Sequence, residues 1–297
     1  MTSPRPSSRP SRPSGPAGPN RPVRPARVLA AVLAAGTLLT TAACSDGDDS
    51  ASSGSGVTAS PVAERAVTTT PTTTATASPT EPLTQAGAQT ALITEGDLED
   101  DWTQVKTAAS WRDRLLIDTV DAAQFVTAKT QSDACQQFLD GLYDDDLLGK
   151  PSGASALTGF QQGDSRLLYQ VAAYQRAALD SKLDWLESLP TECDQFNAVG
   201  SDGSTRTVQV IVNSLPKVGD ARYGLTMTMQ GVSGGAPITL TLDVAVVRVG
   251  DDAITVTNGG LDGADHDSTK DAVSHGTTRL KDVREGRTPA PEPSEFD

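Results

Sequence analysis

Apolar and polar residues alternate along much of the second half of the chain. In the run ITLTLDVAVVRV (238–249), apolar residues fill every second position: Ile238, Leu240, Leu242, Val244 and Val246. A period of two places such side chains on one face of a strand, so this run predicts a half-buried strand. Further strands are expected at RTVQVIVNSLP (206–216), ARYGLTMTMQG (221–231) and AITVTN (253–258), and a hairpin that turns at QGDS at ASALTGFQQGDSRLLYQVAAYQ (154–175).

Other segments follow the helical period. In SDACQQFLDGLYDDD (132–146), Ser132 is a candidate N-cap, and one helix face collects Cys135, Phe138, Leu139 and Leu142. A second helix is predicted at AALDSKLDWLESLP (177–190). It ends at Pro190, and its inward face carries Leu179, Leu183 and Leu186. A short helix is expected near 88–102, broken at Gly96.

The last predicted helix starts at Ser268, whose spacing to Asp271 fits a capping box. Its apolar stripe consists of Ala272, Gly276, Leu280 and Val283. Because consecutive hairpins give an antiparallel sheet, the sequence predicts an α+β fold. We expect a sheet of about five or six strands with helices packed on it, in a single domain over 83–286.

The flanking segments have a different composition. Ser, Thr, Ala, Gly and Pro dominate residues 44–82, and a similar tail follows at 287–297. Segments of this kind bury too little apolar surface to offset the entropy of ordering them. We therefore expect a disordered linker before the domain and a disordered tail after it.

Residues 1–43 have the features of an export signal. Six arginines and no acid precede the apolar run Val28–Leu39, and small residues follow it. The run has twelve residues, which is too short to span a bilayer, because a helix needs about 20. A basic region, a short apolar region and small residues are typical of a signal peptide. The alternative is a buried helix of a cytosolic protein.

Cys44 directly follows Ala42 and Ala43. The segment resembles the lipobox of bacterial lipoproteins, in which the cysteine after small residues is acylated, although Thr41 stands where that pattern prefers Leu. The resemblance implies lipidation at Cys44 and a lipid anchor, such as palmitate, in the membrane, on the extracytoplasmic face of the cell. The alternative is cleavage at an Ala-x-Ala-like site and full secretion.

Charge and composition exclude several functions. The formal net charge is −14, which argues against a nucleic acid partner, since phosphate binding needs basic patches. The sequence has no P-loop and no GxGxxG after a strand, so no nucleotide cofactor is expected. With only His266 and His275 and no cysteine cluster, a zinc site has too few ligands.

Two segments contain candidate chemistry. GVSGG (231–235) matches G-x-S-x-G, and Asp262 and His275 follow Ser233 in the order found in α/β-hydrolases. The motif falls between two predicted strands, whereas a nucleophile elbow needs a helix after it. Asp262, Asp265, His266 and Asp267 could bind calcium weakly, but their spacing does not fit the EF-hand loop, and a solvated loop that caps the last helix is the alternative.

The chain has three tryptophans. Trp185 lies on a predicted helix beside core leucines, whereas Trp102 and Trp111 lie in irregular sequence near charged residues, where one of them could line a groove. No ligand-binding residue can be assigned from these positions.

The order of these segments resembles a known actinobacterial family, the PknH-like extracellular sensor domain. The resemblance covers about 90–286 and rests on ALITEGDLEDDW, Cys135, LESLPTECDQF around Cys193, LPKVGDARYGLTMTM, VVRVGDDAITVT and the closing helix. It implies a sensor-like domain, here on a stand-alone lipoprotein. The kinase version has two disulfides, while only Cys135 and Cys193 remain here after Cys44.

Cys135 and Cys193 are predicted to pair. Exported thiols oxidise, and only one pairing is possible once Cys44 is acylated. Two unrelated buried thiols are the alternative. The sequence thus favours a non-catalytic, extracytoplasmic surface lipoprotein that binds an unknown small ligand or a protein partner. A structural or cell-wall-binding domain is the second reading, and a Ser233-dependent hydrolase is the third.

Overall fold

The computed structural model describes residues 82–98 and 101–290. The predicted signal peptide, Cys44, nearly all of the predicted linker and most of the tail lie outside the described residues.

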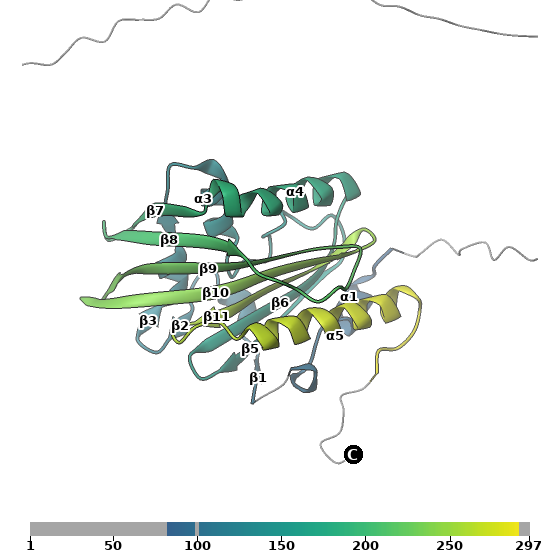
Figure 1. Cartoon of the computed structure of the whole chain (residues 1–297). Helices are drawn as coiled ribbons and strands as arrows, with labels where there is room; N and C mark the ends of the chain where they lie inside the picture. The colour runs from purple at the N-terminus through teal and green to yellow at the C-terminus, as the bar shows by residue number, and fades with distance from the viewer. Residues whose placement is uncertain (1–81, 99–100, 291–297) are drawn as a thin grey trace, which may run out of the picture. The chain divides into compact units, whose positions relative to one another are not determined.

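Nine strands form one antiparallel sheet in the order β1-β5-β6-β11-β10-β9-β8-β7-β4 (Figure 1). The α+β class is confirmed, but the sheet is larger than the five or six strands predicted. The six predicted strands are present, and β1, β4 and β7 extend the sheet at its two edges. The strands are β1 (Thr103–Val105), β4 (Ala128–Lys129), β5 (Ser155–Gln162), β6 (Ser165–Ala173), β7 (Gln195–Gly200), β8 (Thr205–Val212), β9 (Ala221–Ser233), β10 (Ala236–Val249) and β11 (Asp252–Gly260), with a separate pair β2 (Leu116–Ile117) and β3 (Val120–Asp121).

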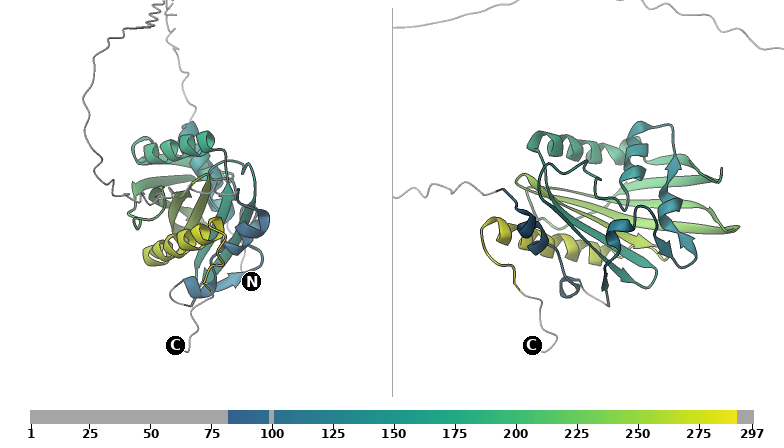
Figure 2. Two further views of the ribbon diagram at one scale, coloured as in Figure 1. Left: turned by 90° about the vertical axis from the view of Figure 1, so that its right-hand side faces the viewer. Right: turned by 180° about the vertical axis from the view of Figure 1, so that it is seen from behind.

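Helices cover both faces of this sheet. On one face α4 packs on β8 and β9, and α3 packs on α4; on the other, α5 packs on β10 and β11, and α1 on β5. Seen from behind, the segment from 101 to 150 lies over the sheet (Figure 2). The helices are α1 (Gln85–Thr90), α2 (Ala122–Val126), α3 (Asp133–Gly141), α4 (Arg176–Glu192) and α5 (His266–Arg284), with 3-10 turns η1 (Glu95–Asp97) and η2 (Ala108–Ser110).

The centre of the sheet is buried on both sides. In β10, Leu242, Val244 and Val246 belong to the core under α3 and α4, while Ala245 and Val247 belong to the core under α1 and α5. The prediction of a half-buried strand is therefore wrong for this part of β10. The cause is α5, which returns after β11 and covers the second face.

Two predicted helix boundaries also differ from the structure. Pro190 does not end α4, which continues to Glu192; the Cys193 N–H still bonds to the Leu189 carbonyl, at 2.7 Å, so the last turn stays closed. The closing helix begins at His266 with Asp265 as its N-cap, two residues before the predicted start at Ser268. Ser132 does cap α3, as predicted, through its side chain and the Cys135 N–H.

Cys135 and Cys193 form the predicted disulfide. Their Cα atoms lie 5.7 Å apart, and both residues are fully buried. The bond ties α3 to the residue that follows α4, so it joins the two helices that cover one face of the sheet.

The ends of the described chain and two of the hairpins lie at opposite ends of the sheet. Helix α1 and the last turn of α5 lie together at the right-hand end in Figure 1, so the described chain begins and ends there. The β7–β8 and β9–β10 hairpins lie at the opposite end. Between α4 and α5, the ribbon shows no helix in front of the left-hand halves of β8, β9 and β10 (Figure 1).

Candidate binding face and the His266–Asp243 pair

The uncovered part of the sheet presents one face of four strands, which we call the open face. Its residues alternate with buried ones such as Val208, Met227 and Leu240, whose side chains point into the opposite core. All are exposed or half-buried: Gln195, Asn197, Val199, Thr205, Thr207, Gln209, Ile211, Thr226, Thr228, Gln230, Val232, Pro237, Thr239 and Thr241.

The residues of the open face lie in rows across the strands. One row runs Asn197, Thr207, Gln230, Thr239, and the next Gln195, Gln209, Thr228, Thr241. None of these residues is charged, although 21% of the chain is. Hydroxyl and carboxamide groups each donate and accept hydrogen bonds, so the open face can bond a neutral polar partner in either direction.

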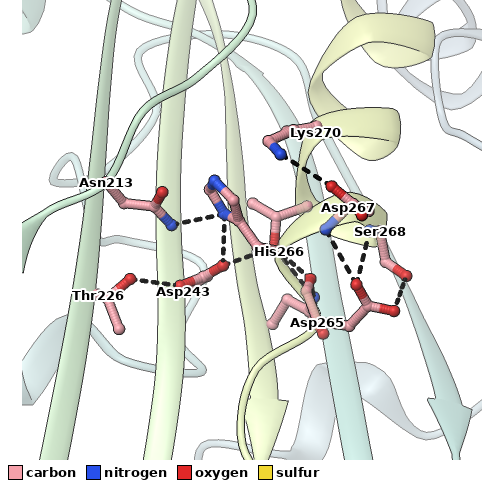
Figure 3. A network of polar contacts seen from close by, with 10 residues as sticks. Asn213, Thr226, Asp243, Asp265, His266, Asp267, Ser268 and Lys270 are labelled. Carbon is pink, nitrogen blue, oxygen red and sulfur yellow. Dashed lines mark hydrogen bonds and ion pairs between the residues drawn. The ribbon is translucent and has the colours of Figure 1, made fainter.

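A third row ends in a buried acid. It runs from Ile211 through Thr226 to Asp243 of β10, whose side chain is only 3% exposed. Asp243 accepts hydrogen bonds from the Thr226 hydroxyl (2.6 Å) and the Thr269 hydroxyl (3.3 Å), and its Oδ2 lies 3.0 Å from Nδ1 of His266 (Figure 3). A buried carboxylate is costly unless it is bonded in this way.

His266 is the first residue of α5, and its ring borders the open face. Its side chain is 32% exposed. The Asn213 side-chain amide lies 2.8 Å from the same Nδ1 (Figure 3). Both contacts meet Nδ1, so they fix the orientation of the ring and leave Nε2 outside this pair of contacts. Nε2 lies on the far side of the ring from Asp243 (Figure 3).

The start of α5 is fixed by further polar contacts. The Asp265 carboxylate accepts from the N–H groups of Asp267 and Ser268, and Asn258 of β11 donates to the Asp265 carbonyl at 2.7 Å. Lys270 bonds to Asp267 at 2.8 Å, and this bond holds the pKa of Asp267 below its ordinary value. His266 thus sits on a helix end that is anchored to the sheet.

The structure divides the acidic cluster that was considered for calcium. Asp265 is used as the N-cap of α5, His266 pairs with Asp243, and Asp267 pairs with Lys270. Asp262 is exposed on the loop after β11. Within 82–98 and 101–290, no group of His, Cys, Asp and Glu is arranged to hold a metal ion.

Ser233 does not lie in a nucleophile elbow. It ends β9, and β10 follows at Ala236, so the motif is a strand–turn–strand hairpin. Ser233 lines a cavity of about 150 Å³ beside the buried Arg206, where burial lowers the pKa of the guanidinium. His275, on α5, has its Nδ1 3.8 Å from Asp97, and it belongs to a different part of the domain.

The tryptophans line no groove. Trp102 and Trp111 are buried, at 4% and 5% exposure, and Trp102 donates from Nε1 to Ser268 at 3.0 Å. The hypothesis that either one lines a binding groove is therefore wrong. Trp185 packs half-buried against the core under α4.

Asp243, Asn213 and Thr226 are site residues that the sequence pattern did not indicate. Asp243 had a visible signal, since it is the one acid within the run LTLDVAVV. Its place on the second, buried face of β10 follows only from the covering helix. Asn213 and His266 come together because β8 ends beside the start of α5, which no local pattern indicates.

The fold is thus built on a nine-stranded antiparallel sheet with helices packed on both faces and part of one face open. No family model matches the chain, and no curated protein matches it. Among solved structures, the extracellular domain of PknH from Mycobacterium tuberculosis is similar, with a TM-score of 0.41 and 11% sequence identity over 70% of this chain and 100% of that one. No helix in the described part of the chain is long and apolar enough to cross a membrane.

Proposed function

We propose that the protein is a lipid-anchored, extracytoplasmic binding domain without catalytic activity, and that the open face is its binding surface. The location is supported by the basic and apolar residues of 1–43, by the lipobox-like Cys44, and by a disulfide of the kind that oxidising compartments maintain. Acylation of Cys44 with more than one chain would suffice to hold the domain at a membrane.

The observation that carries the proposed binding role is the lack of charge on the open face. The chain has a net charge of −14, and a domain surface normally mixes charges of both signs to stay soluble. The open face consists mainly of Thr, Gln, Asn, Val and Ile and carries no charged side chain. When a partner covers it, no charge loses its hydration, so the electrostatic cost of burial is small.

The placement of the chain ends suits this role. The described chain begins at residue 82, at the same end of the domain as the last turn of α5, and the hairpins that border the open face lie at the other end (Figure 1). A tether that reaches residue 82 from the membrane would leave the open face accessible.

Charged substitutions test this binding surface. The mature full-length chain would be sedimented with isolated envelope fractions of the host cell, beside variants Gln209→Glu and Thr228→Glu. Both positions accept a longer or charged side chain because both point away from the core. We expect each variant to bind at least about tenfold more weakly, because a charge on the open face loses its hydration when a partner covers it.

Thr278→Glu is the matched control. Thr278 is exposed on α5, away from the open face, so this variant adds the same charge elsewhere. If the control and the two open-face variants bind equally well, the open face is not the binding surface.

The anchor has its own test. Cys44→Ala should release the protein into the medium or leave it unprocessed, because the acylated thiol is gone. Fractionation of cells that express the variant measures this. A variant that still sediments wholly with membranes would exclude lipidation at Cys44.

A further inference from the structure

A contribution to folding stability does not account for the buried carboxylate of Asp243. Its side chain is 3% exposed in the middle of a strand whose neighbours on the same face, Ala245 and Val247, are apolar core residues. Replacing a buried ionic pair by apolar side chains is often neutral or stabilising. What the acid provides is a fixed imidazole, because its Oδ2 lies 3.0 Å from Nδ1 of His266 and orients the ring.

A fixed imidazole ring can serve binding only through the atom of a ligand that contacts Nε2. The ring is held by Asp243, by Asn213 and by the first turn of α5, and its side chain remains 32% exposed. Nε2 therefore presents one oriented hydrogen-bonding atom at the border of the open face, next to the row that contains Thr226 and Ile211.

The chemistry of the open face narrows the ligand. Its hydroxyls and carboxamides suit a partner rich in hydroxyl groups, and the methyl groups of Thr, Val199 and Ile211 suit the C–H faces of sugar rings. The fourteen exposed or half-buried residues of the open face carry no charge, so they offer no ion pair to a charged ligand. We propose, on the basis of the proposed binding role, that the open face binds a neutral carbohydrate chain and that one of its hydroxyls forms a hydrogen bond with Nε2 of His266.

The test uses the mature full-length chain and immobilised neutral polysaccharides, namely glucan, mannan, galactan and arabinan, with polygalacturonate as the acidic comparator. We expect retention on at least one neutral polymer and none on the acidic one. His266→Phe should weaken this binding about five- to tenfold, the effect of one lost hydrogen bond. His266→Gln, which keeps a hydrogen-bonding group at the end of the side chain, should recover part of it.

Control variants separate the outcomes. Thr278→Glu should bind like the wild type, and Gln209→Glu should bind weakly. Because His266→Phe removes a partner of the buried Asp243, its thermal midpoint should fall, and binding is therefore compared well below that midpoint, where the variant is folded. Retention that His266→Phe leaves unchanged would overturn the role of Nε2.

Failure of the carbohydrate proposal is distinguishable from failure of the binding role. If no neutral polymer is retained while envelope binding still depends on Gln209 and Thr228, the carbohydrate proposal is wrong and a protein partner takes its place. If envelope binding is also insensitive to these positions, the binding role of the open face is wrong as well.

Discussion

The disulfide between Cys135 and Cys193 should supply a large share of the stability of the domain. The bond spans 58 residues, a segment that contains the β5–β6 hairpin and all of α4. In the chain-entropy model, closing a loop of this size stabilises the fold by about 4 kcal/mol. For a domain of this length, each kcal/mol shifts the melting temperature by about 2–4 °C, so the expected loss is at least about 8 °C.

Two samples measure this contribution independently. Wild-type protein melted with and without a phosphine reductant keeps its side chains and loses only the cross-link. The double variant Cys135→Ala, Cys193→Ala loses the cross-link and two fully buried sulfurs. We expect both samples to melt lower, and the double variant lowest, because truncation in a core adds a cavity cost.

A reduced protein that melts within about 2 °C of the oxidised one would refute the entropic argument. It would mean that the unfolded chain is restricted in some other way. Alkylation of the folded, unreduced protein, followed by mass measurement, checks that the bond is present in the sample.

Two shorter predictions concern α5 and the β9–β10 hairpin. Gly276→Ala should cost about 2 kcal/mol or more in thermal unfolding, because a methyl group there would overlap the buried Tyr169 ring; Thr278→Ala, on the exposed side of α5, should stay close to the wild type. Purified protein should show no ester or peptide hydrolysis that Ser233→Ala abolishes, since no elbow surrounds Ser233; a turnover that depends on this hydroxyl would contradict the assignment.

The strands that the sequence predicted are those with long alternation. β5, β6, β8, β9, β10 and β11 have eight or more residues each, enough for a period of two to stand out. β1 has three residues and β4 has two, too few to show any period. β7 reads QFNAVG and does alternate, with Gln195 and Asn197 exposed and Ala198 buried, but it has only six residues to carry the period.

The sequence also indicates in part that both faces of β10 are buried. The run DVAVVRV is apolar on both parities, and such runs indicate strands buried on both sides. The start of α5 was not readable, because Asp265 and Ser268 are both good N-cap residues one turn apart. Tertiary contacts decide between them: the Ser268 hydroxyl accepts a hydrogen bond from Trp102 and donates one to Asp265.

The candidate site could not be assembled from the sequence, because its parts are brought together by strand order. His266 and Asp243 are separated by 23 residues, and His266 and Asn213 by 53. They meet only because β10 lies between β11 and β9 and α5 folds back over them. The open face was hidden for the same reason, since which side of an alternating strand stays uncovered depends on where the helices return.

The last prediction concerns the ion pair between Asp252 and Arg284. Its pH dependence distinguishes the loss of charge pairing from the loss of side-chain packing as the cause of instability. Both side chains are mostly buried, at 3% and 14% exposure, and the Arg284 guanidinium also donates to the Val249 carbonyl at 3.2 Å. Arg284→Met should cost about 3 kcal/mol at pH 7, because it leaves a buried carboxylate without its partner. Arg287→Met, at a half-exposed ion pair, should cost little.

Burial raises the pKa of Asp252, and the charge of Arg284 opposes that rise. In Arg284→Met the pKa of Asp252 should therefore be higher still. A carboxyl whose folded-state pKa is raised destabilises the fold above that pKa; this cost shrinks as the pH falls below it and is gone below the pKa of the unfolded chain. The penalty of Arg284→Met in urea unfolding should consequently be smaller at pH 5 than at pH 7. An equal or larger penalty at pH 5 would mean that lost packing of the Arg284 stem, and not the unpaired charge of Asp252, causes the instability.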